Sequence, residues 1–470
     1  MQTSSLTARS RVLIALAAAL AAALGSGLVL AVEPASQAAV PLTSTLVQAA
    51  EPVAPPSVST LRQLIEEALI NSPDIAAAAR EKEAAAHRIS PAGALDDPMF
   101  EAGLVNVPIS PLRLDREDMT MKMLGISQRL PYPGKRGLRE AVAAREAESV
   151  ALGYLETVNR VVRDVKLAYY DLALAGRSIE IVERNKRLVA QLLQIAEGRY
   201  SIGQGAQADL LRVQTQLAKI DEDLLRMRRE RHSTQADLER LVGRRGEAAP
   251  IEAPMPVLAP APLLIGALSE AALRDRPQLL GLKTLIHKSQ KALDLARRDY
   301  YPDFDVRFQY GQREKMPDGT PRADMFSLTV AINLPIWKKQ KLDPRVAEVQ
   351  AMREQTISLH QAQQNELIAR LRQQVAIATQ SRESAQLYRT GILPQARLAL
   401  ESAVAAYMVN KVDFRMLLDS QMSVLSYEVN HAAAVVAYSK AIAEIDQLVG
   451  KPVFSMHPAS KKVQPGTEAN

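Results

Sequence analysis

Two stretches in the second half of the chain alternate between apolar and polar residues, the pattern of strands with one apolar face. In the first stretch, apolar residues alternate with Asp305, Arg307 and Gln309, and in the second they alternate with small or polar residues. Between them, the turn-rich segment Met316-Pro-Asp-Gly-Thr-Pro321 predicts a hairpin. The apolar face predicted for this hairpin consists of Phe304, Val306, Phe308, Tyr310, Phe326, Leu328, Val330 and Ile332.

A weaker hairpin pattern lies in the first half, over residues 100–107 and 119–130. In its second strand, Met119, Met121 and Met123 occupy alternate positions. Because thioethers suit Cu(I), a soft-metal path is one interpretation of this row. We favour the other interpretation, a packed strand face.

The segments after the hairpins predict very long helices. Residues 136–198 contain no proline, and 63 residues of α-helix measure roughly 95 Å. Residues 345–406 form the matching run, and shorter helices are predicted over 61–95 and 206–242. Two short helices stacked end to end would run alongside one long helix. Steps of three and four between apolar residues predict left-handed coiled-coil packing, as in Leu155, Val158, Val162, Val165, Tyr169 and Leu172.

The two halves repeat one another. Three prolines recur 204 residues later: Pro73, Pro98 and Pro131 match Pro277, Pro302 and Pro335. Tyr200 matches Tyr407 at an offset of 207, so the second copy gains three residues. The pattern predicts two copies of a helix-strand-strand-long helix-helix unit, over 61–242 and 265–450. A Pro-rich linker is predicted over 243–264 and disordered tails over 32–60 and 451–470.

Residues 1–31 have the order of a secretory signal peptide. Arg9 and Arg11 precede an apolar, alanine-rich segment, and small residues follow it. A membrane anchor is the alternative, since Val12–Val32 is uncharged and long enough to span. Nothing later is an uncharged apolar run of spanning length, so any later membrane insertion is expected to use strands.

Composition excludes several kinds of chemistry. The chain has no cysteine, which excludes disulfides, thiolate zinc sites and cysteine nucleophiles. A net charge of +6 over 470 residues, without a basic run interleaved with aromatics, does not indicate nucleic-acid binding. The six histidines lack metal-binding spacing, and no nucleotide fingerprint or Ser/His/Asp motif occurs. We therefore expect no enzyme, no metal and no cofactor.

Four predicted strands per chain are too few to close a barrel, for which about eight is the minimum. Their lengths nevertheless suit a tilted outer-membrane strand, which needs ~9–11 residues. Open edges in lipid leave backbone groups unpaired, at several kcal/mol each. If these strands enter a membrane, several chains must therefore share one barrel, and three chains would give twelve strands.

The ordered set of these features resembles the TolC-like outer-membrane factor family of tripartite efflux and type I secretion systems. The resemblance rests on the duplicated unit, on the Leu-Pro pair before each long helix and on the turn after it. It implies a mainly α fold with a small β part, in which long coiled-coil hairpins form an α-barrel. The four strands would contribute to a trimeric 12-stranded outer-membrane β-barrel. The general appearance favours the heavy-metal efflux branch, although most efflux members there carry a lipid-anchored N-terminal cysteine and this chain has none.

The resemblance also implies functional positions. Asp419 matches the aspartate that lines the periplasmic constriction, and Met416 replaces a companion acidic residue. Three symmetry-related carboxylates in a narrow throat would attract cations. Alternatively, Asp419 is an exposed helix residue or an ion-pair partner. The positions that match the adaptor-facing turns are Arg199, Tyr200, Ile202, Gly203, Gly205, Val409, Asn410 and Lys411.

We interpret the chain as a passive homotrimeric duct in the outer membrane, with its helical tunnel in the periplasm. Its expected partners are a periplasmic adaptor protein, an inner-membrane pump and outer-membrane lipid. The alternative is a soluble periplasmic coiled-coil interaction protein, such as the adaptor itself. An adaptor normally has one helical hairpin flanked by small β-domains, whereas this sequence predicts two hairpins and no such domains.

Overall fold

The structure is a computed structural model that describes residues 60–110, 112–244, 250–259, 263–409 and 411–452. All of them belong to one unit of the chain, Pro56–Asn470. The signal peptide predicted over 1–31 lies outside the described residues. So do nearly all of the predicted tails over 32–60 and 451–470 and parts of the linker over 243–264.

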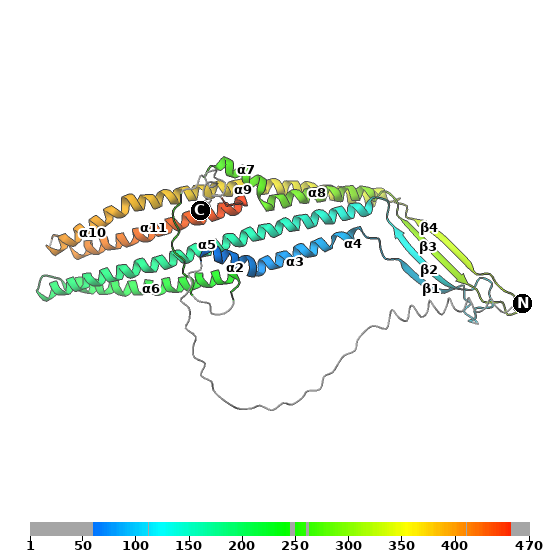
Figure 1. Cartoon of the computed structure of the whole chain (residues 1–470), viewed down its shortest axis with the longest axis horizontal. Helices are drawn as coiled ribbons and strands as arrows, with labels where there is room; N and C mark the ends of the chain where they lie inside the picture. Colours follow the sequence, from blue (N-terminus) through cyan, green and yellow to red (C-terminus); the bar gives the residue numbers. More distant parts are fainter. Residues whose placement is uncertain (1–59, 111, 245–249, 260–262, 410, 453–470) are drawn as a thin grey trace, which may run out of the picture. The chain divides into compact units, whose positions relative to one another are not determined.

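Residues 61–242 hold helices on either side of two strands (Figure 1). In chain order the elements are α2 (Leu61–Asn71), α3 (Pro73–His87), α4 (Ile89–Gly93), β1 (Met99–Val105), β2 (Met121–Leu130), α5 (Lys135–Ser201) and α6 (Gln207–Val242). Local sequence explains the starts of the short helices. Thr60 and Gln63 form a capping box at the start of α2. Pro73 is the first residue of α3, a position whose N–H would have no acceptor within the helix, so the missing N–H of proline costs nothing there.

The same order of elements returns in residues 265–449. The elements are α7 (Ile265–Asp275), α8 (Pro277–Arg298), β3 (Phe304–Gln312), β4 (Met325–Ile332), the π-helical turn η1 (Lys338–Leu342), α9 (Asp343–Leu387), a second π-helical turn η2 (Tyr388–Ile392), α10 (Leu393–Met408) and α11 (Phe414–Val449). We refer to residues 61–242 as the first copy and to residues 265–449 as the second copy. The predicted fold class, mainly helical with four strands, is confirmed.

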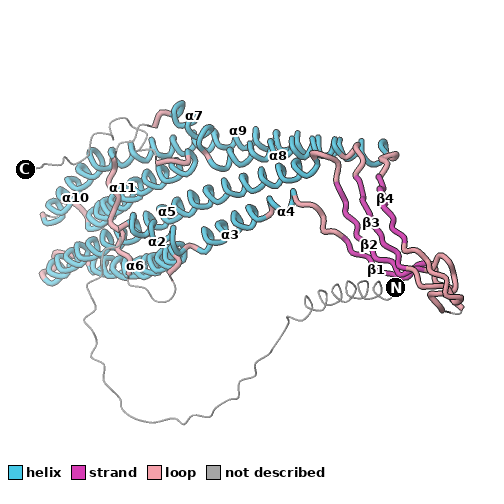
Figure 2. Tube along the Cα trace, turned by 45° about the vertical axis from the view of Figure 1, so that its right-hand side comes forward, coloured by secondary structure: helices cyan, strands magenta, loops and turns pink. Residues whose placement is uncertain are grey.

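The strands form one antiparallel sheet with the order β1-β2-β3-β4. β2 pairs with β3, so the sheet joins the two copies, and Leu130 lies opposite Phe304. β3 pairs with β4, and Phe304 lies opposite Ile332. This register places the eight apolar residues predicted for the second hairpin on one face, together with Phe100, Leu104, Leu124, Ile126 and Leu130. The strands continue from one end of the helices, and the turns between α5 and α6 and between α10 and α11 lie at the other end (Figures 1 and 2).

The methionine row in the first hairpin lies on the face opposite to the apolar one. Met119 precedes β2, whereas Met121 and Met123 point to the side that carries Glu101 and Arg307. Met121 and Met123 are partly buried on this side of β2, whereas Met119 is exposed. Leu124, Ile126 and Leu130 of β2 lie on the opposite, exposed face.

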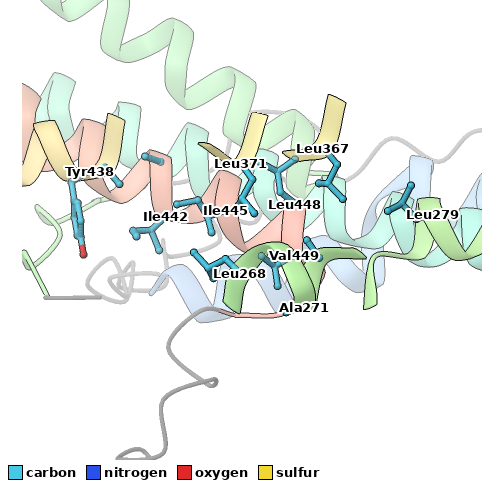
Figure 3. Packing of buried hydrophobic residues seen from close by; sticks show 13 residues of the cluster. Leu268, Ala271, Leu279, Leu367, Leu371, Tyr438, Ile442, Ile445, Leu448 and Val449 are labelled. Atoms are coloured by element: carbon cyan, nitrogen blue, oxygen red, sulfur yellow. The ribbon is translucent and has the colours of Figure 1, made fainter. Parts of the chain in front are cut away.

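The helices pack lengthwise as the heptad pattern predicts. α3 and α6 both contact α5, and α8 and α11 both contact α9. At the middle of the second copy, α7, α8, α9 and α11 enclose an apolar core (Figure 3). Its labelled members are Leu268, Ala271, Leu279, Leu367, Leu371, Tyr438, Ile442, Ile445, Leu448 and Val449. In the described part of the chain, no helix combines the length and the apolarity needed to cross a membrane.

A glycine ends each of the two returning helices against a junction of shorter ones. Gly243 after α6 has φ 79°, and a Cβ there would lie 2.6 Å from the carbonyl oxygen of Asn71. Gly450 after α11 has φ 78°, and its Cβ would lie 3.3 Å from the carbonyl oxygen of Asp275. Both positions require the left-handed backbone that glycine adopts without strain. The short helices were predicted to stack end to end. The two glycines place this contact at the same position in both copies, at the end of α2 in the first and at the end of α7 in the second.

The two copies differ in where their helices are interrupted. α5 is continuous over 67 residues. The matching run, expected to be one helix over 345–406, contains η2 directly before Leu393 and Pro394. A π turn closes a wider hydrogen-bonded ring than an α turn, so η1 and η2 take up part of the three-residue insertion. In the first copy the interruption falls between α3 and α4, where Pro91 has no N–H to donate to the carbonyl of His87.

Candidate pore and docking sites

Two tight turns form the helical tips. After α5, the N–H of Gln204 donates to the carbonyl oxygen of Arg199 at 2.9 Å, and Gly203 adopts φ 74°. A Cβ on Gly205 would lie 3.0 Å from the backbone nitrogen of Tyr200, which leaves little room for a side chain. After α10, the N–H of Lys411 donates to the carbonyl oxygen of Ala406 at 2.9 Å. Asn410, predicted to belong to this tip, lies outside the described residues.

Arg199 joins the two tips. Its guanidinium carbon lies 4.4 Å from the centre of the Tyr407 ring, and the group donates to the carbonyl oxygens of Tyr407 and Gln204. Tyr407 in turn packs edge to face against Phe414, with ring centres 5.4 Å apart. Arg199 is therefore a bridge between the tips, although the sequence indicated only a surface position.

Apolar side chains on these tips face solvent. Tyr200 is 47% exposed, whereas its counterpart Tyr407 is only 5% exposed. Ile202 and Val409 are each more than half exposed, and so is Met408, which the sequence pattern did not single out. The tips thus present an apolar patch of Tyr200, Ile202, Met408 and Val409 with no partner among the described residues, beside the basic Lys411.

Asp419 and Met416 lie on the exposed side of α11. The Asp419 side chain is 71% exposed and Met416 is 56% exposed, while Leu417 and Leu418 are buried against the neighbouring helices. Arg415 approaches Asp419 one turn away, with 3.7 Å between Nε and Oδ2. Such an exposed pair contributes little to stability, so Asp419 is available to solvent and to ions.

The structure also contains a polar site that the sequence did not reveal. A cavity of about 1300 Å³ lies between α5, α6, α10 and α11, with linker residues 251–256 along it. On its wall Glu428 accepts hydrogen bonds from Arg184 at 2.5 Å and from Arg397 at 2.6 Å. These side chains come from three helices with no shared local spacing, so no motif pointed to them.

Charge and burial decide the protonation of this wall. Burial would raise the pKa of Glu428, but the hydrogen bonds from Arg397 and Arg184 outweigh it and hold that pKa below its ordinary value. Burial lowers the pKa of His431, and the nearby Arg389 and Arg177 lower it further. Glu428 is therefore charged and His431 neutral near pH 7. The described residues include no group of three or more His, Asp or Glu side chains placed to hold a metal ion.

The exposed face of the sheet is apolar on all four strands except at Lys122 and Gln128 of β2 and Gln312 of β3. Phe308 and Phe326 stack across neighbouring strands with ring centres 6.0 Å apart. All eight residues predicted for the second hairpin lie on this face, together with residues of the first hairpin. The exposed apolar residues of the sheet on this side are Phe100, Leu104, Leu124, Ile126, Leu130, Phe308, Tyr310, Phe326, Leu328, Val330 and Ile332.

Comparison with known proteins agrees with this architecture. Residues 64–244 match the family model described as outer membrane efflux protein. The solved structure of the channel protein CusC superposes with a TM-score of 0.72 at 15% identity, over 83% of this chain and 92% of that chain. The outer membrane protein VceC of Vibrio cholerae superposes with a TM-score of 0.71 at 18% identity, over 84% of this chain and 96% of that chain. The described residues thus share the fold of these solved proteins, and residues 64–244 carry the match to the outer membrane efflux protein family.

The sequence similarity to known proteins covers only part of the chain. The multidrug resistance outer membrane protein MdtP of Shigella flexneri is 22% identical over 175 residues, which are 37% of this chain. The match spans 36% of the length of that curated relative. At these identities the solved structures establish the fold, and VceC and MdtP are named as outer membrane proteins.

Proposed function

We propose that this chain is the outer-membrane channel component of a tripartite efflux system, a passive trimeric duct from the periplasm to the exterior. The observation that carries the proposal is the four-stranded sheet, whose apolar face is exposed and whose β1 and β4 are edge strands. The match of residues 64–244 to the outer membrane efflux protein family supports the same function.

The edges of the sheet favour a barrel shared between copies. In hydrocarbon, each unpaired backbone N–H or C=O costs several kcal/mol, so β1 and β4 need partners there. Each chain supplies four strands, and a barrel needs about eight or more. Three copies supply twelve strands, and the even number per chain keeps neighbouring strands antiparallel all the way round. The wall of such a barrel would be completed only by identical chains.

The helices supply the rest of the duct. α5, α6 and the α9–α11 series run away from the sheet as long antiparallel pairs, and in a trimer they would form an α-barrel in the periplasm. In the same proposal the tips carrying Arg199, Tyr200 and Val409 dock a periplasmic adaptor through their apolar patch. An inner-membrane pump drives transport and sets the cargo. That this chain belongs to the heavy-metal efflux branch stays a prediction. The curated relatives are named for multidrug resistance.

Asp419 and Met416 are proposed to line the constriction near the tips. Their exposed positions on α11 support a role in the lumen, because the opposite side of α11 is already buried. Three copies of Asp419 around a narrow throat would attract cations and repel anions. In the first copy, Arg212 stands at the position that matches Asp419, and it pairs with Asp209, which matches Met416. The acidic ring would therefore come from Asp419 of the second copy.

Fractionation of cells tests the proposal directly. The protein should be recovered in the outer membrane as a complex that resists mild SDS and dissociates to a single chain on boiling. Recovery in the soluble periplasm as a monomer would contradict it. In the membrane-recovered protein, Asp419→Ala should reduce cation preference in a planar bilayer, with Asp209→Ala as the matched control that leaves it unchanged.

A further inference from the structure

The segment after β4 leaves an unusual set of side chains without partners. Trp337 is 66% exposed, and Ile336 and Leu334 are exposed to a similar extent. Lys338, Lys339 and Lys341 follow on η1, and the described residues offer them no ion pair. An exposed tryptophan next to three uncompensated lysines indicates a surface that another molecule covers.

The matching segment of the first copy shows what such a junction does when its partner is present. There Tyr132 stacks on Tyr301 with ring centres 4.6 Å apart, and Lys135 is 2% exposed. The Lys135 ammonium donates to Asp303 at 2.8 Å and lies 3.4 Å from Asp299. A cation after β2 is thus paired with carboxylates beside the start of β3, on the neighbouring strand. This joint fastens the first copy to the second.

Carboxylates also lie beside the start of β1, at the opposite edge of the sheet. Asp96 and Asp97 are exposed, and neither side chain makes an ion pair with any described residue. Only the backbone oxygen of Asp96 is engaged, by the amide nitrogen of Gln128 at 2.7 Å. One edge of the sheet therefore carries unpaired lysines and the other carries unpaired aspartates, both at the helical end of the strands.

The internal register relates these two edges. Within the chain, Leu130 pairs with Phe304 and Ile126 with Phe308. Moving each residue by the 204-residue offset of the duplication pairs Leu334 with Phe100 and Val330 with Leu104, across β4 and β1. Phe100, Leu104 and Val330 lie on the apolar face, so this register keeps that face continuous. Continued past the strand ends, the same register puts Lys338 opposite Asp96.

In the shared barrel of the proposed function, β4 pairs with β1 of a second copy of this chain. We propose that this pairing takes the register of β2 with β3, and that Lys338, with Lys339 and Lys341 beside it, binds the partner subunit's Asp96 and the partner subunit's Asp97. The pairing rests on the proposed function, since it closes the shared barrel, and it identifies the residues that fasten one copy to the next. At the 204-residue offset Lys135 matches Lys339, and Asp299 matches Leu95, which directly precedes Asp96 and Asp97. Charge complementarity at matched positions favours this occupant over anionic lipid headgroups, which would leave both aspartates unpaired.

Cysteine crosslinking tests the register, because the chain has no native cysteine. The variant Val330→Cys with Leu104→Cys places the two thiols opposite each other on one face of the sheet. The variant Ala331→Cys with Gly103→Cys does so on the other face. Together they cover the hydrogen-bonded and the non-hydrogen-bonded type of cross-strand pair. In the outer membrane, at least one of these variants should give a covalent trimer that survives boiling without reductant. The matched control, Val330→Cys with Gly103→Cys, points its thiols to opposite faces and should give none. Crosslinking of the control in place of the other two would overturn the register.

Charge exchange tests the ion pairs. Lys338→Asp should lower the temperature at which the SDS-resistant trimer dissociates by a few degrees, and adding Asp96→Lys should restore it. Lys315→Asp, at an exposed lysine near the other end of the strands, is the control and should leave that temperature unchanged. The proposal would be overturned if Asp96→Lys did not restore the dissociation temperature and Lys338→Asp lowered it more in phosphatidylglycerol vesicles than in phosphatidylcholine vesicles. The lysines would then be assigned to lipid. A soluble monomer would overturn the proposed function as well. A trimer that is crosslinked only in the control variant, Val330→Cys with Gly103→Cys, would overturn this register alone.

Discussion

The two copies follow one plan of elements but place their irregularities differently. The first copy has an uninterrupted α5 and a break between α3 and α4, whereas the second has an uninterrupted α8 and a π turn within its long helical run. Each break lies beside a proline, Pro91 in one copy and Pro394 in the other. Arg389, Leu393 and Pro394, in and next to this π turn, line the large cavity. The comparison teaches that lengthwise packing is common to both copies, while each copy places its backbone defect elsewhere.

Introducing the second copy's proline into the first should have the largest effect. Arg187 is the residue of α5 that matches Pro394 at the offset of 207, and it is exposed. Arg187→Pro removes a hydrogen bond from a helix that has no π turn to absorb the ring, at a cost of about 3 kcal/mol or more. Thermal unfolding of the purified protein, followed by circular dichroism, measures this loss.

Two controls make that experiment specific. Arg187→Ala should leave the unfolding temperature nearly unchanged, because the side chain is exposed. Pro394→Ala should also change it little, since η2 already provides the wider turn. Equal losses for Arg187→Pro and Arg187→Ala would contradict the view that the backbone of α5 matters here.

The paired tyrosines of the tips separate folding from docking. Tyr407→Ala removes a buried ring that packs on Phe414 and under Arg199, so it should cost about 3 kcal/mol of stability. Tyr200→Ala should change stability by no more than about 0.5 kcal/mol, because that ring is half exposed. Binding to the adaptor, measured by pull-down or calorimetry, should instead weaken with Tyr200→Ala. An unfolding cost for Tyr200→Ala as large as that for Tyr407→Ala would refute this division.

The glycines at the two helix junctions should respond unequally to alanine. Both adopt the left-handed backbone, which costs an alanine about 1–2 kcal/mol. Gly243→Ala should cost more than Gly450→Ala, since its Cβ would meet the Asn71 carbonyl oxygen at 2.6 Å rather than the Asp275 oxygen at 3.3 Å. Urea unfolding of the two variants ranks them, and the reverse order would show that the junctions are not built as described.

The smallest expected difference concerns one carboxylate in each copy. Glu428 accepts from two arginines in a partly buried position, whereas its counterpart Asp221 makes an exposed pair with Lys186. Glu428→Gln should cost about 1.5 kcal/mol, and Asp221→Asn only a few tenths. Urea unfolding at pH 7 should resolve the two variants.

The effect of Glu428→Gln should also depend on pH. The folded protein holds the pKa of Glu428 below its model-compound value of 4.5, so the charged form stabilises the fold above that pH. This contribution is lost as the pH falls below 4.5, because protonation then favours the unfolded chain. Wild type and Glu428→Gln should therefore converge in stability on acidification, and a constant difference down to pH 3 would contradict the assignment.

Local patterns predicted the strands and helices because each depends on neighbouring residues. The alternation from Phe304 to Tyr310 located β3, and the proline-free run after Arg136 located α5. Features that depend on distant contacts were not predictable in this way. The pattern around Met121 could not tell which side of β2 faces outward until pairing with β3 fixed it. Likewise, the partners of Glu428 come from α5 and α10, far from it in sequence.

The most direct test of the central claim is the electrical conductance of the purified full-length protein in a planar lipid bilayer. A sheet completed by identical copies predicts discrete, uniform current steps that persist without any pump or nucleotide. A membrane-extracted protein that inserts but carries no current, or one that stays in solution as a single chain, would contradict the account.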